Sequence, residues 1–476
     1  MSSYCASSQM NRDKSLFTLS VLFQTFILFA LFAVVLLGDP AAMKPVVVSR
    51  VGLCVTVVCA FQLASGGLLK PPFLLFVTFA LFSFGVPLIL AVDPSYSDWY
   101  LQQIDGETFS YFSWYTVLCI QAYCLGLVLA QSYQGGSRNK DGVISRFSAY
   151  LEEHREDVAF VSQFIFTIFG IVSFAYAIKF MGVSLESGIN SARLEVQNSA
   201  LVNLSRGMFV PAGFMSLVYS EHRSRKRFVL SVLFLYAALT SLSGDRTEGL
   251  TLLVAVFVFW YQHMGRLGSA NLLKKVVAIL SCIAIVLLIP AIASFRVGGV
   301  FELNGILNAV EDVFSELGFN FYTVCFQSSL NLPTYHGLTY LASLTSLLPS
   351  SFDFLNLGEI AHGYYGEMLY NQAMAVHYPW ASFGLGYSLV AESFLNFGVY
   401  GFITIVLFGY IIGKLCGQDM EGSFNCYLSF SFLWAFLTVA RRGFEFPVNS
   451  IEYILVFLPV LIFIFVKVRE HFTKRN

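Results

Sequence analysis

The sequence predicts an all-α polytopic membrane protein with about twelve transmembrane helices. Of its 476 residues, 57% are hydrophobic and 12% are charged, whereas soluble domains carry roughly 25% charged residues. Its apolar runs are also long enough for a membrane-spanning helix, which needs about 20 residues. The net charge of −1 gives no basic surface that would favour nucleic acid, so we expect no nucleic-acid partner.

The predicted helices follow one another along the chain. Apolar runs lie near residues 15–37, 46–66, 72–92, 108–131, 158–180, 202–220, 228–243, 249–263, 276–294, 397–415, 424–440 and 451–467. The first run is too long for the apolar core of a signal peptide, so we expect it to remain as a helix. We expect residues 1–476 to form a single transmembrane domain.

The distribution of Lys and Arg predicts the orientation, because cytoplasmic connections carry an excess of basic residues. Most of the 28 basic residues fall in inner connections when the N-terminus is placed in the cytoplasm. Both termini are then cytoplasmic, and the long segment 295–396 lies on the outer face. Its stretch "VEDVFSELGFNF" has apolar residues at helical spacing and acidic residues opposite them, which predicts an amphipathic helix. The aromatic and Gly-rich stretches that follow are typical of an ordered loop over a site.

The stretch "TSLSGDRTEGLT", residues 240–251, places three charged side chains between two apolar runs. The two flanking helices must fit within residues 228–262, although two full crossings need about 40 residues. We therefore expect the turn at membrane depth, where irregular backbone must be buried in protein or line a wet cavity. Arg246 is then a candidate binding residue, with Asp245 and Glu248 as its orienting partners. The alternative is an internal salt bridge that merely neutralises Arg246.

Several other arginines stand at the ends of predicted helices on the outer face, against the usual charge bias. Guanidinium groups bind phosphate oxygens in a bidentate manner and stay charged in any environment. A cluster of them at membrane depth suits a lipid-linked phosphate or diphosphate, and the candidate ligands are Arg193, Arg206, Arg246, Arg296, Arg441 and Arg442. The alternative for any one of them is a side chain that reaches the lipid head groups.

Glycosyl transfer from such a lipid would also need a base that accepts the proton of the acceptor hydroxyl. The candidates that we single out are His377, Glu392 and Glu367. His377 in "AVHYPWASFGLG" is alternatively a hydrogen-bonded loop residue, and Glu392 in "GLGYSLVAESFLNFG" is alternatively a carboxylate that anchors a helix. No metal-ligand spacing and no P-loop is present, so we expect neither a metal nor a cofactor.

Several blocks of the sequence, in this order, resemble the bacterial O-antigen and oligosaccharide repeat-unit polymerases of the Wzy type. The blocks are "SARLEVQNSALVNLSRGMFVPAGFM", "SLSGDRTEGLTLLVAVF", "SFRVGGV", "LLPSSF…GLGYSLVAESFLNFGVYG" and "VARRGFEFPVNS". They fall within residues 190–455. The first 150 residues support the resemblance only through their pattern of apolar runs.

The resemblance implies an inverting, metal-independent glycosyltransferase of the GT-C type in the bacterial inner membrane, with a periplasmic active site under segment 295–396. Undecaprenyl-diphosphate-linked glycans would be donor and acceptor, and membrane lipids, a chain-length regulator and a flippase would be the other partners. Arg246 and Arg296 would bind the leaving diphosphate. Arg206 and Arg441 would stabilise the charge that develops as it departs.

Two other functions would use the same features. The related O-antigen ligases take the same donor with a lipid A core acceptor, and His377 is the local counterpart of their loop histidine. A flippase or transporter of lipid-linked oligosaccharide would instead use the arginines as a translocation path. The long outer segment and the one-sided arginines argue against alternating access, which would distribute charges along the route.

Overall fold

A computed structural model describes the fold over most of the chain. The described residues are 2–65, 67–132, 143–187, 196, 200–243, 246–264, 311, 313–315, 317–330, 332–345, 366–378, 387–416 and 422–473. Every regular element in these ranges is a helix, so the all-α prediction is confirmed.

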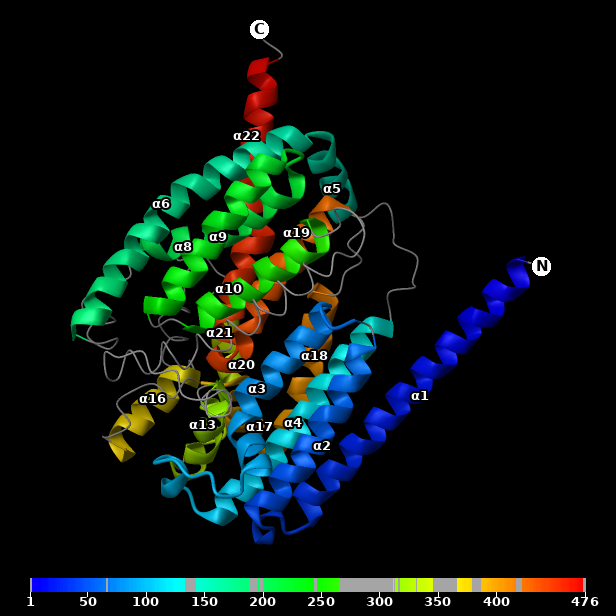
Figure 1. The fold of residues 1–476 in the computed structure, drawn as a ribbon, viewed down its shortest axis with the longest axis vertical. Helices are drawn as coiled ribbons and strands as arrows, with labels where there is room; N and C mark the ends of the chain where they lie inside the picture. The colour runs from blue at the N-terminus through cyan, green and yellow to red at the C-terminus, as the bar shows by residue number, and fades with distance from the viewer. Residues whose placement is uncertain are drawn as a thin grey trace. The chain divides into compact units, whose positions relative to one another are not determined.

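The chain divides into two compact units. The first unit consists of residues 1–137, 317–417 and 439–444, and the second of residues 138–316, 418–438 and 445–476. The short segment 439–444 therefore belongs to the first unit, although the helices that flank it in the chain belong to the second. Both units are bundles of helices (Figure 1). The expectation of one transmembrane domain over residues 1–476 stays a prediction.

Helix α4 (Gly106–Ser132) forms the core of the first unit, since nearly all residues of its apolar span are buried. It packs against α1 (Ser2–Leu37), α2 (Pro45–Ala64), α3 (Pro71–Val92) and α18 (Phe402–Cys416). Figure 1 shows α2, α3, α4 and α18 side by side. Proline begins both α2 and α3, because its fixed φ suits the first turn and its missing N–H would have no partner there.

Glycines allow α4 and α18 to approach closely. Gly409 and Gly413 lie about one turn apart on α18, and Gly126 faces them from α4. A Cβ atom at Gly409 would lie 2.7 Å from the carbonyl oxygen of Tyr123, and one at Gly413 would lie 2.6 Å from Cβ of Ala130. Small residues at this spacing are typical of transmembrane helix pairs, whose association depends on close packing.

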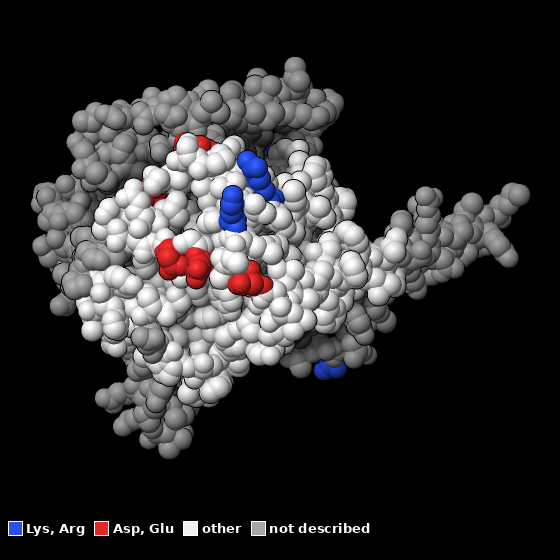
Figure 2. All heavy atoms as spheres, turned by 90° about the horizontal axis from the view of Figure 1, so that it is seen from below, with Lys and Arg blue, Asp and Glu red and all other residues white. Residues whose placement is uncertain are grey.

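Asp98 organises the connection between α3 and α4. Its carboxylate accepts hydrogen bonds from the hydroxyls of Tyr96 and Tyr322 and from the backbone N–H of Leu101, which begins the short helix η2 (Leu101–Gln103). Figure 2, seen from the lower side of Figure 1, shows a small group of acidic and basic side chains on a face whose described surface is otherwise mostly uncharged. The hydrogen bonds that the structure describes at Asp98 thus all come from neutral donors.

The second unit packs α6 (Arg155–Ser187) against α8 (Ala200–Tyr219) and α9 (Arg223–Ser243), and α9 against α10 (Arg246–Phe259). Its other elements are α5 (Val143–Glu153), the π-helix η4 (Trp260–Met264), α19 (Ser423–Leu437), α21 (Glu445–Glu452), the π-helix η9 (Tyr453–Phe457) and α22 (Leu458–Thr473). A Cβ atom at Gly249 would lie 2.6 Å from the carbonyl oxygen of Ala237. The first turn of α10 therefore rests directly on the backbone of α9.

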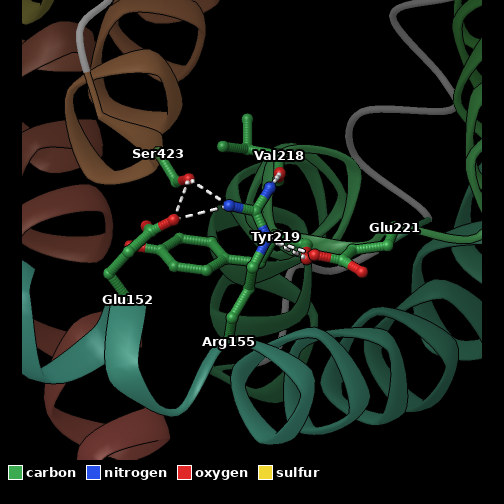
Figure 3. A network of polar contacts seen from close by, with 6 residues as sticks. All are labelled: Glu152, Arg155, Val218, Tyr219, Glu221 and Ser423. Atoms are coloured by element: carbon green, nitrogen blue, oxygen red, sulfur yellow. Dashed lines mark hydrogen bonds and ion pairs between the residues drawn. The ribbon is translucent and has the colours of Figure 1, made fainter.

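Arg155 joins several helix ends of the second unit (Figure 3). Its Nε and Nη2 donate to the carbonyl oxygens of Tyr219 and Val218, each at 3.1 Å, where α8 ends. Its Nη1 contacts Oε1 of Glu152 at 2.5 Å and Oγ of Ser423 at 3.2 Å. The last carbonyls of a helix have no partner within it, so the guanidinium satisfies them while it links α8 to α5 and α19.

Eight helical segments among the described residues are long and apolar enough to cross a membrane. They are Thr18–Leu37, Pro45–Ala64, Pro71–Val92, Gly106–Gln131, Arg155–Val183, Leu201–Tyr219, Leu389–Cys416 and Val448–His471. Helices α9, α10 and α19 coincide with further predicted spans, and the predicted span 276–294 lies outside the described residues. The protein is thus a polytopic helical membrane protein, and the total of about twelve spans stays a prediction.

The segment 295–396 contributes short helices to the first unit. They include α13 (Asn320–Gln327), α14 (Leu338–Thr345) and α16 (Gly366–His377). Helix α16 is amphipathic, since it buries Gly366, Tyr370 and Met374 and exposes most of its other described side chains. Helix α13 is buried on all sides, because α3, α4 and α17 surround it. The expected amphipathic stretch therefore ends in a core helix rather than at a surface.

Candidate functional site

Helix α17 (Leu389–Phe397) carries Glu392 into the interior of the first unit. Oγ of Ser388 accepts a hydrogen bond from the backbone N–H of Ala391 at 3.1 Å, as hydroxyl side chains commonly do at helix starts. Gly398 ends the helix with a φ of 57°, a conformation that favours glycine. Leu389 and its neighbours are buried, and only 2% of the surface of Glu392 is exposed.

Both carboxylate oxygens of Glu392 accept hydrogen bonds from neutral donors. Oε1 accepts from the hydroxyl of Thr339 at 2.9 Å, and Oε2 accepts from the backbone N–H of Phe444 at 2.8 Å. Thr339 accepts in turn from Nδ2 of Asn396 at 2.6 Å, and Oδ1 of Asn396 accepts from the N–H of Gly337 at 2.9 Å. A carboxylate withdrawn from water needs such donors, because an unsatisfied buried charge is very costly.

The turn Arg441–Phe444 lies against this carboxylate. Helix α20 (Val439–Arg442) is followed by Gly443, whose φ of 64° lies in the left-handed region that favours glycine. A Cβ atom on Gly443 would lie 2.8 Å from Oε2 of Glu392. The backbone N–H of Tyr387 donates to the carbonyl oxygen at the start of the turn at 3.2 Å. Both arginines of the turn are partly exposed.

Helix α16 reaches the same turn through Tyr387. A Cβ atom on Gly366 would lie 2.8 Å from Cε1 of Tyr387, and the rings of Tyr370 and Tyr387 have centroids 5.7 Å apart. His377 is the last residue of α16 and is exposed. Glu367 lies in the first turn of α16, and its side chain is outside the described residues. The first unit thus brings the elements that carry the predicted bases to the turn with the arginines.

A second group of predicted residues meets in the second unit. Arg206 on α8 forms an ion pair with Glu248 on α10, and 19% and 3% of their side chains are exposed. The guanidinium also lies over the ring of Tyr176 on α6, at 5.3 Å from the centroid. A cation is attracted to the negative face of an aromatic ring, so three helices contribute to the environment of this one arginine.

The pairing of Arg246 with Asp245 and Glu248 stays a prediction. Helix α9 ends at Ser243 and α10 begins at Arg246, so the two helices separate at the predicted place in the chain, and the depth of that place in the membrane stays a prediction. The carboxylate of Glu248 contacts Arg206. The predicted site residues that lie outside the described part of the chain are Arg193, Asp245 and Arg296, together with the side chains of Arg246 and Glu367.

Sequence reasoning missed several residues that build this site. Gly443 could have been recognised, because a glycine directly after basic residues is a helix-end signal. Asn396 could also have been found, since it follows Glu392 by four positions and therefore lies on the same helix face. Thr339 and Tyr176 carry no comparable signal in the sequence.

The apolar helices and the polar groups buried among them define an integral membrane protein of the polytopic α-helical class. Residues 16–476 match the family of the O-antigen polysaccharide polymerase Wzy, so the chain belongs to this family. The match covers nearly the whole chain and confirms the resemblance of the sequence blocks. No curated protein and no solved structure matches the chain.

Family membership gives the protein a role as a polysaccharide polymerase, and therefore as an enzyme. It also implies lipid-linked oligosaccharides in the membrane as substrates. Among the alternatives raised by the sequence, the match favours the polymerase over the ligase and the transporter.

Proposed function

We propose that this polymerase joins undecaprenyl-diphosphate-linked repeat units at the periplasmic face of the inner membrane, as an inverting, metal-independent glycosyltransferase of the GT-C type. The observation that carries the proposal is the family match over residues 16–476. The growing glycan leaves its lipid carrier and is transferred to the non-reducing end of a new lipid-linked unit. A chain-length regulator and a flippase are the proposed protein partners.

In this reaction an acceptor hydroxyl attacks the anomeric carbon of the donor, and the bond between that carbon and the diphosphate oxygen breaks. A base takes the hydroxyl proton, and undecaprenyl diphosphate leaves with the bonding electron pair. Cationic groups lower the barrier by stabilising the negative charge that develops on the leaving oxygen. Transfer with inversion needs neither a covalent intermediate nor a metal ion.

We assign the binding of the diphosphate to Arg246 and Arg296. Arg206 and Arg441 supply further positive charge, and Arg193 and Arg442 are the remaining cations proposed for this site. Guanidinium groups suit the task because they present several N–H donors in one plane to phosphate oxygens. For Arg206, the ion pair with Glu248 fixes the orientation of the guanidinium and offsets part of its charge.

His377 is the base that we favour, with Glu367 as the next alternative. Its exposed position at the end of α16 leaves its imidazole accessible to a substrate hydroxyl. A neutral imidazole accepts a proton near neutral pH. Glu392, by contrast, is buried and has a hydrogen bond to each carboxylate oxygen.

The reaction is tested with purified full-length protein and synthetic diphosphate-linked repeat units. A ladder of products of increasing length on a gel supports the polymerase. Transfer to a lipid A core acceptor alone would identify a ligase, and movement of the substrate across vesicles without any product would identify a transporter. The absence of any longer product with authentic substrate overturns the proposal.

The arginine assignment is tested with Arg246→Ala and Arg296→Ala. Removing a group that stabilises a developing oxyanion typically costs about 10²–10³ in rate, so elongation should fall below detection while folded protein remains. Arg146→Ala is the matched control, since Arg146 is an exposed arginine on α5 in a predicted cytoplasmic connection. Wild-type elongation by both test variants would refute the assignment.

A further inference from the structure

We infer that Glu392 is a positioning residue, whose carboxylate anchors the turn Arg441–Phe444 and thereby holds both arginines of that turn for the diphosphate. The purpose of holding the arginines rests on the proposed function. The anchoring itself rests only on contacts within the first unit, so the two can be tested separately.

Residues of two helices, α14 and α17, fix the carboxylate of Glu392. The hydroxyl of Thr339 on α14 donates to Oε1 at 2.9 Å, and Asn396 on α17 donates to that same hydroxyl oxygen at 2.6 Å. Nδ2 of Asn396 also contacts the carbonyl oxygen of Glu392 at 2.9 Å. The start of α14 is fixed as well, since the backbone N–H of His336 donates to the carbonyl oxygen of Asn396 at 2.9 Å. Glu392 therefore has one rigid orientation relative to both helices.

The turn is attached to this support at successive residues. The carbonyl oxygen of Arg441 accepts from Tyr387, Gly443 has no side chain where it meets the carboxylate, and the N–H of Phe444 donates to Oε2. The ring of Phe444 stacks on Phe408 with centroids 4.6 Å apart. It also meets the ring of Tyr340 edge-on at 5.5 Å. The path of the backbone through both arginines is thus defined by the contacts around Glu392.

These contacts argue for anchoring rather than proton transfer. A catalytic base must come within hydrogen-bond reach of the hydroxyl that it deprotonates. Glu392 is 2% exposed, and its two oxygens already accept from Thr339 and from the backbone of Phe444. In this arrangement both oxygens of the carboxylate face donors of the protein rather than a position open to an acceptor sugar.

The anchor is tested on full-length protein in detergent with Glu392→Gln. A carboxamide carries an NH2 donor in place of one carboxylate oxygen, so either Thr339 or the backbone N–H of Phe444 then faces a donor, and the remaining hydrogen bond loses the charge of its acceptor. Local opening of the turn should then make trypsin cleavage after Arg441 and Arg442 about tenfold faster or more, measured from the masses of the fragments. Glu107→Gln is the matched control, because Glu107 is an exposed carboxylate in the first turn of α4. Its cleavage at the turn should equal that of the wild type.

Thr339 provides a second variant in case Glu392→Gln does not fold. Thr339→Val removes the hydroxyl that donates to Oε1, and we expect faster cleavage at the turn, by a smaller factor than for Glu392→Gln. Thr339→Ser keeps the hydroxyl and should restore the wild-type rate. Wild-type cleavage in both Glu392→Gln and Thr339→Val would overturn the anchor.

Kinetics separate positioning from proton transfer. If Glu392 positions the arginines, Glu392→Gln should raise KM for the diphosphate-linked donor and leave the shape of the pH–rate profile unchanged. Loss of the acidic limb of the profile at an unchanged KM would make Glu392 the base and overturn the inference. Elongation by Arg441→Ala and Arg442→Ala at the wild-type rate would instead refute the role of these arginines in the proposed function. The rate of trypsin cleavage would still test whether Glu392 holds the turn.

Discussion

The contacts that the structure describes for two buried carboxylates, Glu248 in the second unit and Glu392 in the first, differ in kind. In the second unit Glu248 meets the guanidinium of Arg206. In the first unit Glu392 accepts from a hydroxyl and a backbone N–H. The same pattern recurs at the edge of the first unit, where Asp105 accepts from the backbone N–H and the hydroxyl of Thr108.

The difference indicates what each carboxylate does. A buried ion pair makes its two members dependent on each other, because either one alone would be an uncompensated charge. A carboxylate that accepts from backbone N–H groups instead fixes the path of the chain at a turn or a helix start. We therefore expect the second unit to respond to charge removal mainly in stability, and the first unit to respond mainly in the geometry of its turns.

The largest expected effect is that of Arg206→Ala. It removes the described ion-pair partner of Glu248, whose side chain is 3% exposed, and removing one partner of a buried pair costs about 3–5 kcal/mol. We expect a clear fall in the midpoint of thermal unfolding in detergent. The double variant Arg206→Met with Glu248→Leu should recover most of this loss, since apolar replacement of a buried pair is often neutral. A double variant as unstable as Arg206→Ala would contradict the comparison.

The sequence predicted the elements of both regions better than their contacts. The charged stretch between two apolar runs predicted a break between two helices near Arg246, and α9 ends at Ser243 and α10 begins at Arg246. The depth of this break in the membrane, which the length argument predicted, stays a prediction. The partner expected for Glu248 was its chain neighbour Arg246, because proximity along the chain is the only distance that a sequence displays. The contact that the structure describes is with Arg206, which depends on how α8 packs beside α10 and leaves no trace in hydrophobic periodicity.

The same limit applies to Glu392. Its apolar surroundings predicted a carboxylate with an unusual environment, and its burial agrees with that. Its donors come from Thr339 and Phe444, which are 53 and 52 positions away in the chain. Only tertiary packing brings them together. The sequence therefore identified Glu392 as a candidate and did not decide whether it acts as a catalytic base or as an anchor.

A smaller effect is expected for Arg155→Met in the second unit. Arg155 donates to the carbonyl oxygens of Tyr219 and Val218 at the end of α8, and hydrogen bonds from a charged donor contribute roughly 1.5–3 kcal/mol. Arg155→Lys should be intermediate, because an ammonium group cannot span both carbonyls and a carboxylate. The midpoints of thermal unfolding in detergent should fall in the order wild type, Arg155→Lys, Arg155→Met.

High salt then separates the two kinds of contact at Arg155. Its carboxylate partners Glu152 and Glu221 have side chains that are 44% and 68% exposed. At about 1 M salt the Debye length is roughly 3 Å, so the attraction between such exposed charges is strongly weakened. The carbonyl oxygens are neutral, so we expect most of the loss in Arg155→Met to persist at high salt. A loss that disappears at high salt would show that the exposed ion pairs dominate.

The smallest expected effect concerns Asp105, at the start of α4 in the first unit. The backbone N–H of Thr108 and then its hydroxyl, at 2.7 and 2.8 Å, hold the pKa of Asp105 below its ordinary value. Because the pKa is lower in the folded state, this stabilisation is present above the unfolded pKa of about 3.9. It is lost as the pH falls through the folded pKa.

Asp105→Asn should therefore lower the unfolding midpoint slightly at pH 7, and this loss should shrink as the pH falls below the unfolded pKa of about 3.9 towards and through the folded pKa, since Asn can still cap the helix. Asp105→Ala removes the cap at neutral and acidic pH alike, at a cost of about 1 kcal/mol. Unfolding midpoints of the wild type and both variants across this range make the measurement. A loss of stability in Asp105→Asn that stays constant down to the acid limit of the folded state would mean that the negative charge of Asp105 contributes nothing, and that the first unit uses this carboxylate only as a neutral acceptor.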